Sequence, residues 1–280
     1  MRTSNAMQLK ALINARAKKS GIMPQRVLQG YLLERIMERI SLSHWRNCIV
    51  IKGGVLISSL IGTDKRSTKD LDATVKGFPL THENAERAFK EIAAIDADDG
   101  FSFEFVRTED IREEDDYPGI RIHLGAHYES IEAPITIDVT TGDKITPDAI
   151  EYKYPLLFED RTIALMAYPI QTILAEKLET VISRDVGNTR MRDYYDIHML
   201  WHSRGDEIDR DVLRAAFVAT AEKRGSSSEM AHYRTALNRV IENGGMAQRW
   251  DRYAKQYSYV GDLTLAQTCE TAIQIMSYIF

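Results

Sequence analysis

The sequence has 280 residues, of which 44% are hydrophobic and 28% are charged, as is typical of a globular protein with one large domain or two smaller ones. The chain has 36 basic and 41 acidic residues, so it carries no overall positive charge that would attract nucleic acid. Binding of nucleic acid would therefore require a local patch of basic residues. Cys48 and Cys269 are too far apart in sequence for a thiolate zinc motif, and no apolar stretch predicts a signal peptide or a membrane span, so we expect a cytoplasmic protein.

Two helices are predicted at the start of the chain. Residues 6–21 end at a glycine, and residues 24–40 begin with Pro24, a residue that suits the first helical turn. Apolar residues at helical spacing, such as Tyr31 and Ile36, predict one buried face on the second helix. We interpret both helices as scaffold.

Short strands and helices are predicted between residues 48 and 141. Strands are expected at 48–51, 71–75, 101–106, 119–128 and 133–141, with helices at 55–62 and 82–95. This order predicts an α+β fold in which a mixed sheet is flanked by helices. After Pro155 a helical pattern returns and predicts a C-terminal helical bundle. We therefore expect one domain at residues 1–150 and a second at 151–280.

Two aspartates at the strand of residues 71–75 form the first candidate site. Asp70 and Asp72 are two residues apart, so the alternation of a strand places both on one face. Carboxylates this close repel each other unless a cation lies between them. Oxygen ligands without histidine favour Mg²⁺, or Mn²⁺ in its place.

Asp138 is a candidate third carboxylate, because it alternates with Ile137 and Val139 in another predicted strand. If that strand neighbours the strand of Asp72, Asp138 lies within reach of the pair, as in a site that holds two metal ions. The alternative interpretation is a polar residue on a solvated face of the sheet.

Lys52, Gly53 and Gly54 follow a predicted strand and precede a predicted helix. Glycine allows backbone amides to approach a phosphate closely, and the start of a helix favours an anion. An ordinary turn is the alternative, and the pattern is neither a Walker A loop nor a dinucleotide-binding fingerprint. What favours a phosphate-binding turn over an ordinary turn is the order along the chain: a strand, the two glycines, a helix, Arg66 and then the two aspartates.

Four segments in this order resemble the AbiEii/AbiGii toxin nucleotidyltransferases, which belong to the DNA polymerase β-like superfamily. They are IVIKGGVLISSLIG at 49–62, RSTKDLDAT at 66–74, ILAEKLETVISR at 173–184 and RMRDYYDIHML at 190–200. The resemblance implies a Mg²⁺-dependent enzyme that transfers a nucleoside monophosphate from an NTP to an acceptor hydroxyl and releases pyrophosphate. It also implies the toxin of a toxin–antitoxin or abortive-infection pair, with tRNA as a plausible acceptor and a cognate antitoxin encoded nearby.

The resemblance further implies which residues form the site. Asp70, Asp72 and Asp138 would bind metal, and Lys177 and Asp196 would be catalytic residues from the helical half that complete the cleft. The nucleotide contacts would come from Lys52, Gly53, Gly54, Arg66 and Thr68. The third carboxylate stays open between Asp138 and a helical aspartate, Asp193 or Asp196.

Two other functions stay open at this point. One is a nucleotidyltransferase that modifies a small molecule or a protein side chain. The other is a non-catalytic module that binds nucleotide or RNA through the same residues. The sequence does not specify the NTP, the acceptor, the oligomeric state or the antitoxin.

Overall fold

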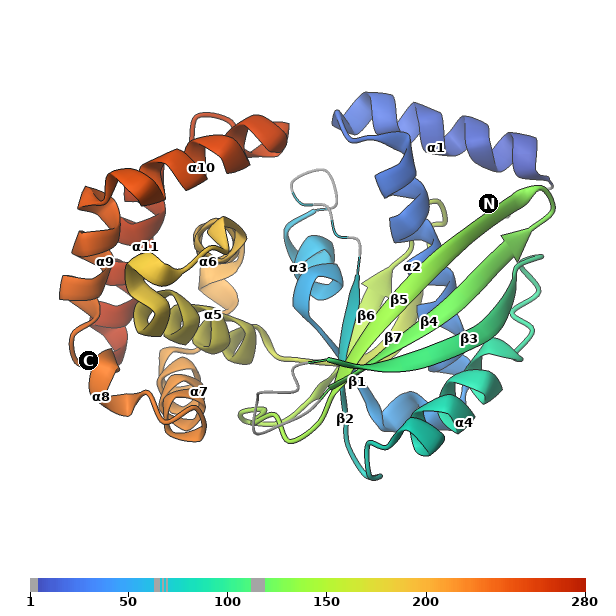
Figure 1. Cartoon of the computed structure of the whole chain (residues 1–280), viewed down its shortest axis with the longest axis horizontal. Helices are drawn as coiled ribbons and strands as arrows, with labels where there is room; N and C mark the ends of the chain where they lie inside the picture. The colour runs from blue at the N-terminus through green and yellow to red at the C-terminus, as the bar shows by residue number, and fades with distance from the viewer. Residues whose placement is uncertain (1–4, 63–65, 67, 69, 112–118) are drawn as a thin grey trace. The chain divides into compact units, whose positions relative to one another are not determined.

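The computed structural model describes residues 5–62, 66, 68, 70–111 and 119–280 (Figure 1). Its chain forms two compact units. The first unit comprises Met1–Ser59, Arg66–Asp143 and Ile150–Ala167, and the second comprises Leu60–Lys65, Lys144–Ala149 and Tyr168–Phe280.

A seven-stranded mixed sheet forms the centre of the first unit, with the strand order β3-β4-β5-β2-β1-β7-β6. Strand β2 lies between β1, to which it is antiparallel, and β5, to which it is parallel. The sheet confirms the predicted α+β class. Its strands are β1 (Ile49–Lys52), β2 (Leu71–Val75), β3 (Ser102–Ile111), β4 (Gly119–Tyr128), β5 (Ile131–Thr140), β6 (Ile150–Pro155) and β7 (Thr162–Ala167).

One face of this sheet is apolar and the other carries polar residues near its centre. In β2, the buried Leu71 and Ala73 alternate with Asp72 and Thr74, so the strand separates the two kinds of side chain. Helices pack on β3, β4, β5 and β7 and help to bury the apolar core. The helices of this unit are α1 (Ala6–Ser20), α2 (Pro24–Leu42), α3 (Gly53–Ile61) and α4 (His82–Ala93).

Helix α2 is held to the start of β3 by an ion pair. The guanidinium of Arg39, which is 0% exposed, donates two hydrogen bonds of 2.9 Å to the Asp99 carboxylate and one of 2.7 Å to the Phe101 carbonyl. This arrangement satisfies the charge of a buried arginine inside the scaffold. The structure buries every residue from Tyr31 to Ile40, so the burial of α2 extends beyond the single buried face predicted from the sequence.

The second unit is helical, as predicted for the C-terminal part of the chain. Helix α11 begins with a capping box, in which the side chains of Thr264 and Gln267 each accept a backbone amide of the other residue. The helices are α5 (Ile170–Arg184), α6 (Met191–Arg204), α7 (Arg210–Lys223), α8 (Ser227–Met230), α9 (Tyr233–Glu242), α10 (Gly244–Gln256) and α11 (Leu265–Ile279). No helix within the described ranges has the length and hydropathy that a bilayer span requires.

Two strands were not predicted from the sequence. Strand β6 ends at Pro155, and β7 lies in the region after Pro155 where a helical pattern was expected. The sheet therefore continues to Ala167, beyond the expected domain boundary at residue 150. Parallel pairing of β7 with β1 explains the strand, because a tertiary contact overrides the helical preference of its Ala, Leu and Met residues.

Candidate active site

Charged residues form a row across five adjacent strands of the sheet. Residues that are direct partners in a ladder share a face, and the partners here are Lys52 with Asp72, Asp72 with Asp138, Asp138 with Arg121, and Arg121 with Glu109. The conditional prediction that the strand of Asp138 neighbours that of Asp72 is confirmed by this register. The row places the two carboxylates of Asp72 and Asp138 next to each other.

Asp70 immediately precedes β2, and Asp72 is the second residue of that strand. Asp70 is exposed, and its Oδ1 accepts a hydrogen bond of 3.4 Å from the Thr136 hydroxyl. Burial raises the pKa of the Asp72 carboxyl, and the negative charges of Asp138 and Asp70 raise it further, against the opposing effects of Lys52 and the Gly54 amide. A carboxylate in such surroundings is stabilised by an added cation.

The Gly53–Gly54 turn is packed directly against Asp72. Gly53 has a φ of +63°, and a Cβ atom built on it would lie 2.1 Å from Asp72 Oδ2. The Gly54 amide donates to the same oxygen at 3.5 Å, a long hydrogen bond. Both glycines are therefore required by close contact, and α3 begins at this turn rather than after it, as the sequence had suggested.

Arg66 and Thr68 enclose the turn on its other side. The buried Arg66 donates from Nη1 to the Gly54 carbonyl at 2.6 Å, and Ser58 Oγ donates to the Arg66 carbonyl at 2.9 Å. A Cβ atom on Gly54 would lie 2.4 Å from Thr68 Oγ1 and 2.8 Å from Arg66 Nη1. In this structure Arg66 therefore contacts the backbone of the turn, and the phosphate contact expected from the sequence stays a prediction.

Lys52 is buried and its ammonium is bound by residues at the end of β5 and just after it. Its Nζ donates to Thr140 Oγ1 at 2.7 Å and to Asp143 Oδ2 at 2.5 Å, and Asp143 also accepts hydrogen bonds from Thr74 and Thr140. Burial alone would raise the pKa of Asp143, but the charge and hydrogen bonds of Lys52 and the two hydroxyls lower it to about 2. The resulting cluster joins β1, β2 and β5 beside the candidate site.

Replacing Asp143 with asparagine is expected to lower the free energy of unfolding by about 3 kcal/mol, because the buried Lys52 ammonium loses its carboxylate partner. Because the folded-state pKa lies below the ordinary value of 3.8, ionised Asp143 stabilises the fold above that value. This contribution, about 2 kcal/mol, is lost as the pH falls through the folded pKa. Urea unfolding at neutral pH and at about pH 3 should therefore show a smaller difference between variant and wild type at the lower pH.

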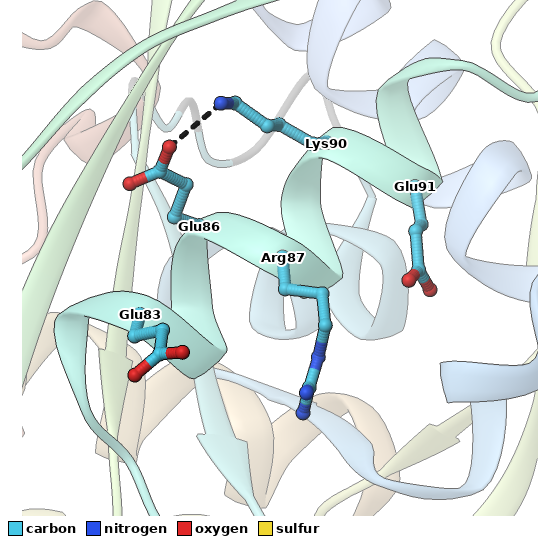
Figure 2. Close-up of a pocket in the computed structure, with 5 residues that line it drawn as sticks. All are labelled: Glu83, Glu86, Arg87, Lys90 and Glu91. Atoms are coloured by element: carbon cyan, nitrogen blue, oxygen red, sulfur yellow. Dashed lines mark ion pairs between the residues drawn. The ribbon is translucent and has the colours of Figure 1, made fainter.

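The matched control is Glu86→Gln, on the exposed face of α4 shown in Figure 2. Glu86 Oε1 pairs with Lys90 Nζ at 2.6 Å, four residues further along the helix. Because both side chains are exposed, the substitution should change the free energy of unfolding by less than about 0.5 kcal/mol. Equal losses in the two variants would contradict the importance given to the buried pair.

Asp138 is already engaged by an arginine. Arg121 Nε donates to Asp138 Oδ1 at 2.7 Å, and Arg121 Nη2 donates to Oδ2 at 2.8 Å. Among the described residues, no group of three histidine, cysteine, aspartate or glutamate side chains could hold a metal ion. The structure thus places Asp70, Asp72 and Asp138 on one side of the sheet without assembling them as a set of three ligands.

In the second unit, Lys177 on α5 lies between two carboxylates of α6. Its Nζ is 2.6 Å from Asp193 Oδ1 and 2.9 Å from Asp196 Oδ2. Asp196 is 0% exposed, whereas Lys177 and Asp193 are partly accessible. The three predicted residues of the helical half are therefore brought together within this unit, and the lysine neutralises a buried negative charge.

The substitution Lys177→Met is expected to lower the free energy of unfolding by about 3 kcal/mol, because it removes the cation beside the buried Asp196. Thermal and urea unfolding measure the loss. Lys90→Met, which removes a lysine from an exposed pair, is the control and should cost less than about 1 kcal/mol. A stable Lys177→Met protein would show that the cluster is not needed for the fold.

The hollow shown in Figure 2 lies on the surface of α4. It is lined by Glu83, Glu86, Arg87, Lys90 and Glu91, which all belong to one surface of α4. None of the residues predicted for the site lines it. Its mixed charges at the spacing of adjacent helical turns indicate a solvated helix face.

Two residues beside the site were not identified from the sequence. Asp143 follows β5 in the segment TTGD, and Arg121 alternates with apolar residues in β4. Alternation places Arg121 on the polar face, but its partner depends on the register between β4 and β5, which one sequence does not specify. For Asp143, the sequence shows only a carboxylate shortly after the strand of Asp138, and no local pattern indicates its role.

The chain is similar to one protein family and to two solved structures. A family model described as "Nucleotidyl transferase AbiEii toxin, Type IV TA system" matches residues 35–274. The protein JHP933 from Helicobacter pylori is 14% identical in sequence with a TM-score of 0.48, over 91% of each chain. A candidate nucleotidyltransferase from H. pylori has the same identity and TM-score over 92% of this chain and 94% of its own. No curated protein matches the chain.

Proposed function

The chain belongs to the AbiEii family of nucleotidyltransferase toxins, and we propose that Asp70, Asp72 and the Gly53–Gly54 turn bind the triphosphate of an NTP with a divalent cation. The reaction would transfer the nucleoside monophosphate to an acceptor hydroxyl and release pyrophosphate. The observation that carries the proposal is the contact between the turn and Asp72, which joins a backbone suited to phosphate with a carboxylate suited to metal.

The charges around β2 fit one divalent cation. Lys52 is paired with Asp143 and Arg121 is paired with Asp138, so Asp70 and Asp72 account for two negative charges. Carboxylate oxygens suit Mg²⁺ or Mn²⁺, with the remaining ligands coming from substrate phosphate and water. Such an ion would neutralise charge at the transferred phosphorus and make the acceptor hydroxyl more acidic.

The surrounding residues would position the substrate. The amides of the Gly53–Gly54 turn would donate to phosphate oxygens, and Arg66 would fix the turn through the Gly54 carbonyl. Lys52 would act indirectly, because its ammonium is occupied by Thr140 and Asp143. Holding the triphosphate in one geometry supplies much of the catalysis expected for phosphoryl transfer.

We assign Lys177 and Asp196 to the site on the strength of family membership and their close contact with each other. Lys177 would supply positive charge for the reaction, and Asp196 would orient the lysine. Because the same pair neutralises a buried charge, loss of activity in its variants counts as catalytic only where the fold is retained.

We propose an RNA, with tRNA as the first candidate, as the acceptor, and the bacterial cytoplasm as the place of reaction. Membership of a toxin family implies an antitoxin partner. The antitoxin could act without touching the toxin, and its gene is expected close to that of the toxin.

The test incubates the purified protein with each of the four α-labelled NTPs and total RNA in Mg²⁺. Label on an RNA band with one or more NTPs is the expected result, and removal of Mg²⁺ by EDTA should abolish it. Transfer to a small molecule or to protein would overturn the RNA acceptor and keep the enzyme class. No transfer from any NTP to any of these acceptors would overturn the proposed reaction.

A further inference from the structure

The charged row across the sheet contains one pair of like neighbours. From β1 to β3 the row consists of Lys52, Asp72, Asp138, Arg121 and Glu109, so the signs alternate except between the two aspartates. Like charges on directly paired residues destabilise a sheet. A cation at this point of the row reduces the repulsion, and the chain itself supplies one to Asp138 from the next strand.

Arg121 binds Asp138 in a way that occupies both carboxylate oxygens. The two parallel hydrogen bonds of 2.7 and 2.8 Å form the bidentate geometry in which a guanidinium and a carboxylate interact most strongly. The Arg121 side chain is 36% exposed and that of Asp138 is 17% exposed, so the pair lies at the accessible polar face. Arg121 Nη1 is also 3.7 Å from Glu109 Oε1, which holds the guanidinium from the other side.

We infer that Arg121 takes the place of a second metal ion, so that the site binds one divalent cation on Asp70 and Asp72 while Asp138 positions the arginine. This inference rests on the proposed function. A two-metal site holds its ions about 3.5–4 Å apart, on carboxylates that bridge or flank them. Here a second ion would compete for Asp138 oxygens that already accept two N–H groups, and it would lie beside a fixed positive charge.

The arrangement changes the role expected for Asp138. A carboxylate held by an arginine is a weak metal ligand, because the guanidinium charge lowers the negative potential at both oxygens. Asp138 is then a positioning residue that fixes Arg121, which lies three strands from Lys52 in the sheet. Arg121 in turn reduces the repulsion that Asp138 exerts on Asp72, and one divalent ion is enough to neutralise the two remaining aspartates.

Counting bound Mn²⁺ by electron paramagnetic resonance tests this inference with the metal alone. Wild type and Asp138→Asn should each bind one ion with affinities that agree within about threefold. Arg121→Gln, which removes the charge, should bind a second ion. Arg107→Gln is the matched control, because Arg107 lies on the neighbouring strand and pairs with Glu109 rather than with Asp138, so this variant should bind one ion. Thermal unfolding verifies that each variant is folded.

Two ions bound by the wild type, or loss of Mn²⁺ binding in Asp138→Asn, would overturn the inference by making Asp138 a ligand. One ion bound by folded Arg121→Gln would also overturn it. If Arg121→Gln does not fold, the inference is tested by Asp138→Asn alone. Binding of one Mn²⁺ ion by this variant, with the affinity of the wild type, supports the inference. These outcomes differ from those expected if the proposed function itself is wrong. In that case the wild type would bind no Mn²⁺, or Asp72→Asn would still bind it.

Discussion

Asp72→Asn is expected to reduce nucleotidyl transfer at least about a thousandfold, because a metal-binding carboxylate contributes several kcal/mol to the transition state and each 1.4 kcal/mol is about tenfold in rate. The substitution should not destabilise the folded protein. Burial and the charges of Asp138 and Asp70 raise the pKa of Asp72, so the ionised carboxylate is disfavoured in the folded protein. A neutral amide removes that cost, and the free energy of unfolding should stay the same or increase.

The measurement pairs an initial rate of label transfer with urea unfolding for the same protein sample. Asp70→Asn should also lose most of its activity, whereas Asp110→Asn, an exposed aspartate of β3 beside His82, should retain it. An active Asp72→Asn enzyme would contradict the assignment of the site. A parallel loss of activity and stability would instead assign Asp72 a structural role.

Gly53→Ala is expected to reduce transfer by about a hundredfold or more, since a displacement of about 1 Å at a catalytic group can cost that much. The new Cβ atom would lie 2.1 Å from Asp72 Oδ2 and 2.7 Å from its Cγ, so the carboxylate must move. The φ of +63° adds strain, because a left-handed conformation costs a residue with a Cβ atom about 1–2 kcal/mol.

Gly30→Ala provides the matched control for this substitution. Gly30 lies within α2, and a Cβ atom built on it meets nothing within 4 Å. Alanine should therefore leave activity unchanged and increase the free energy of unfolding by about 0.5–1 kcal/mol, as expected inside a helix. Equal activity in Gly53→Ala and Gly30→Ala would show that the turn does not position Asp72.

Local sequence patterns predicted the individual residues and elements of the site better than the contacts between them. Strand alternation placed Asp72 on a polar face, and the Gly-Gly turn before a helix was visible in the sequence. Alternation also placed Asp138 on a polar face, but its position beside Asp72 depended on the two strands being neighbours, which the register confirms. The fold class followed from the same patterns.

The remaining features depend on contacts between distant segments. Arg121 pairs with Asp138 through the register of β4 and β5, and Lys52 forms an ion pair with Asp143, which lies beyond the end of β5. Strand β7 was missed because its composition suits a helix, and only its pairing with β1 and β6 makes it a strand. Such pairings are fixed by packing of the whole unit, which one sequence does not reveal.

The most direct test compares NTPs labelled at the α-phosphate and at the γ-phosphate, using total RNA and either wild-type protein or Asp72→Asn. We expect α-label to appear on RNA with the wild type, γ-label to appear as pyrophosphate, and neither product with the variant. Transfer of γ-label to the acceptor would contradict nucleotidyl transfer, and α-label transfer by Asp72→Asn at the wild-type rate would contradict the site.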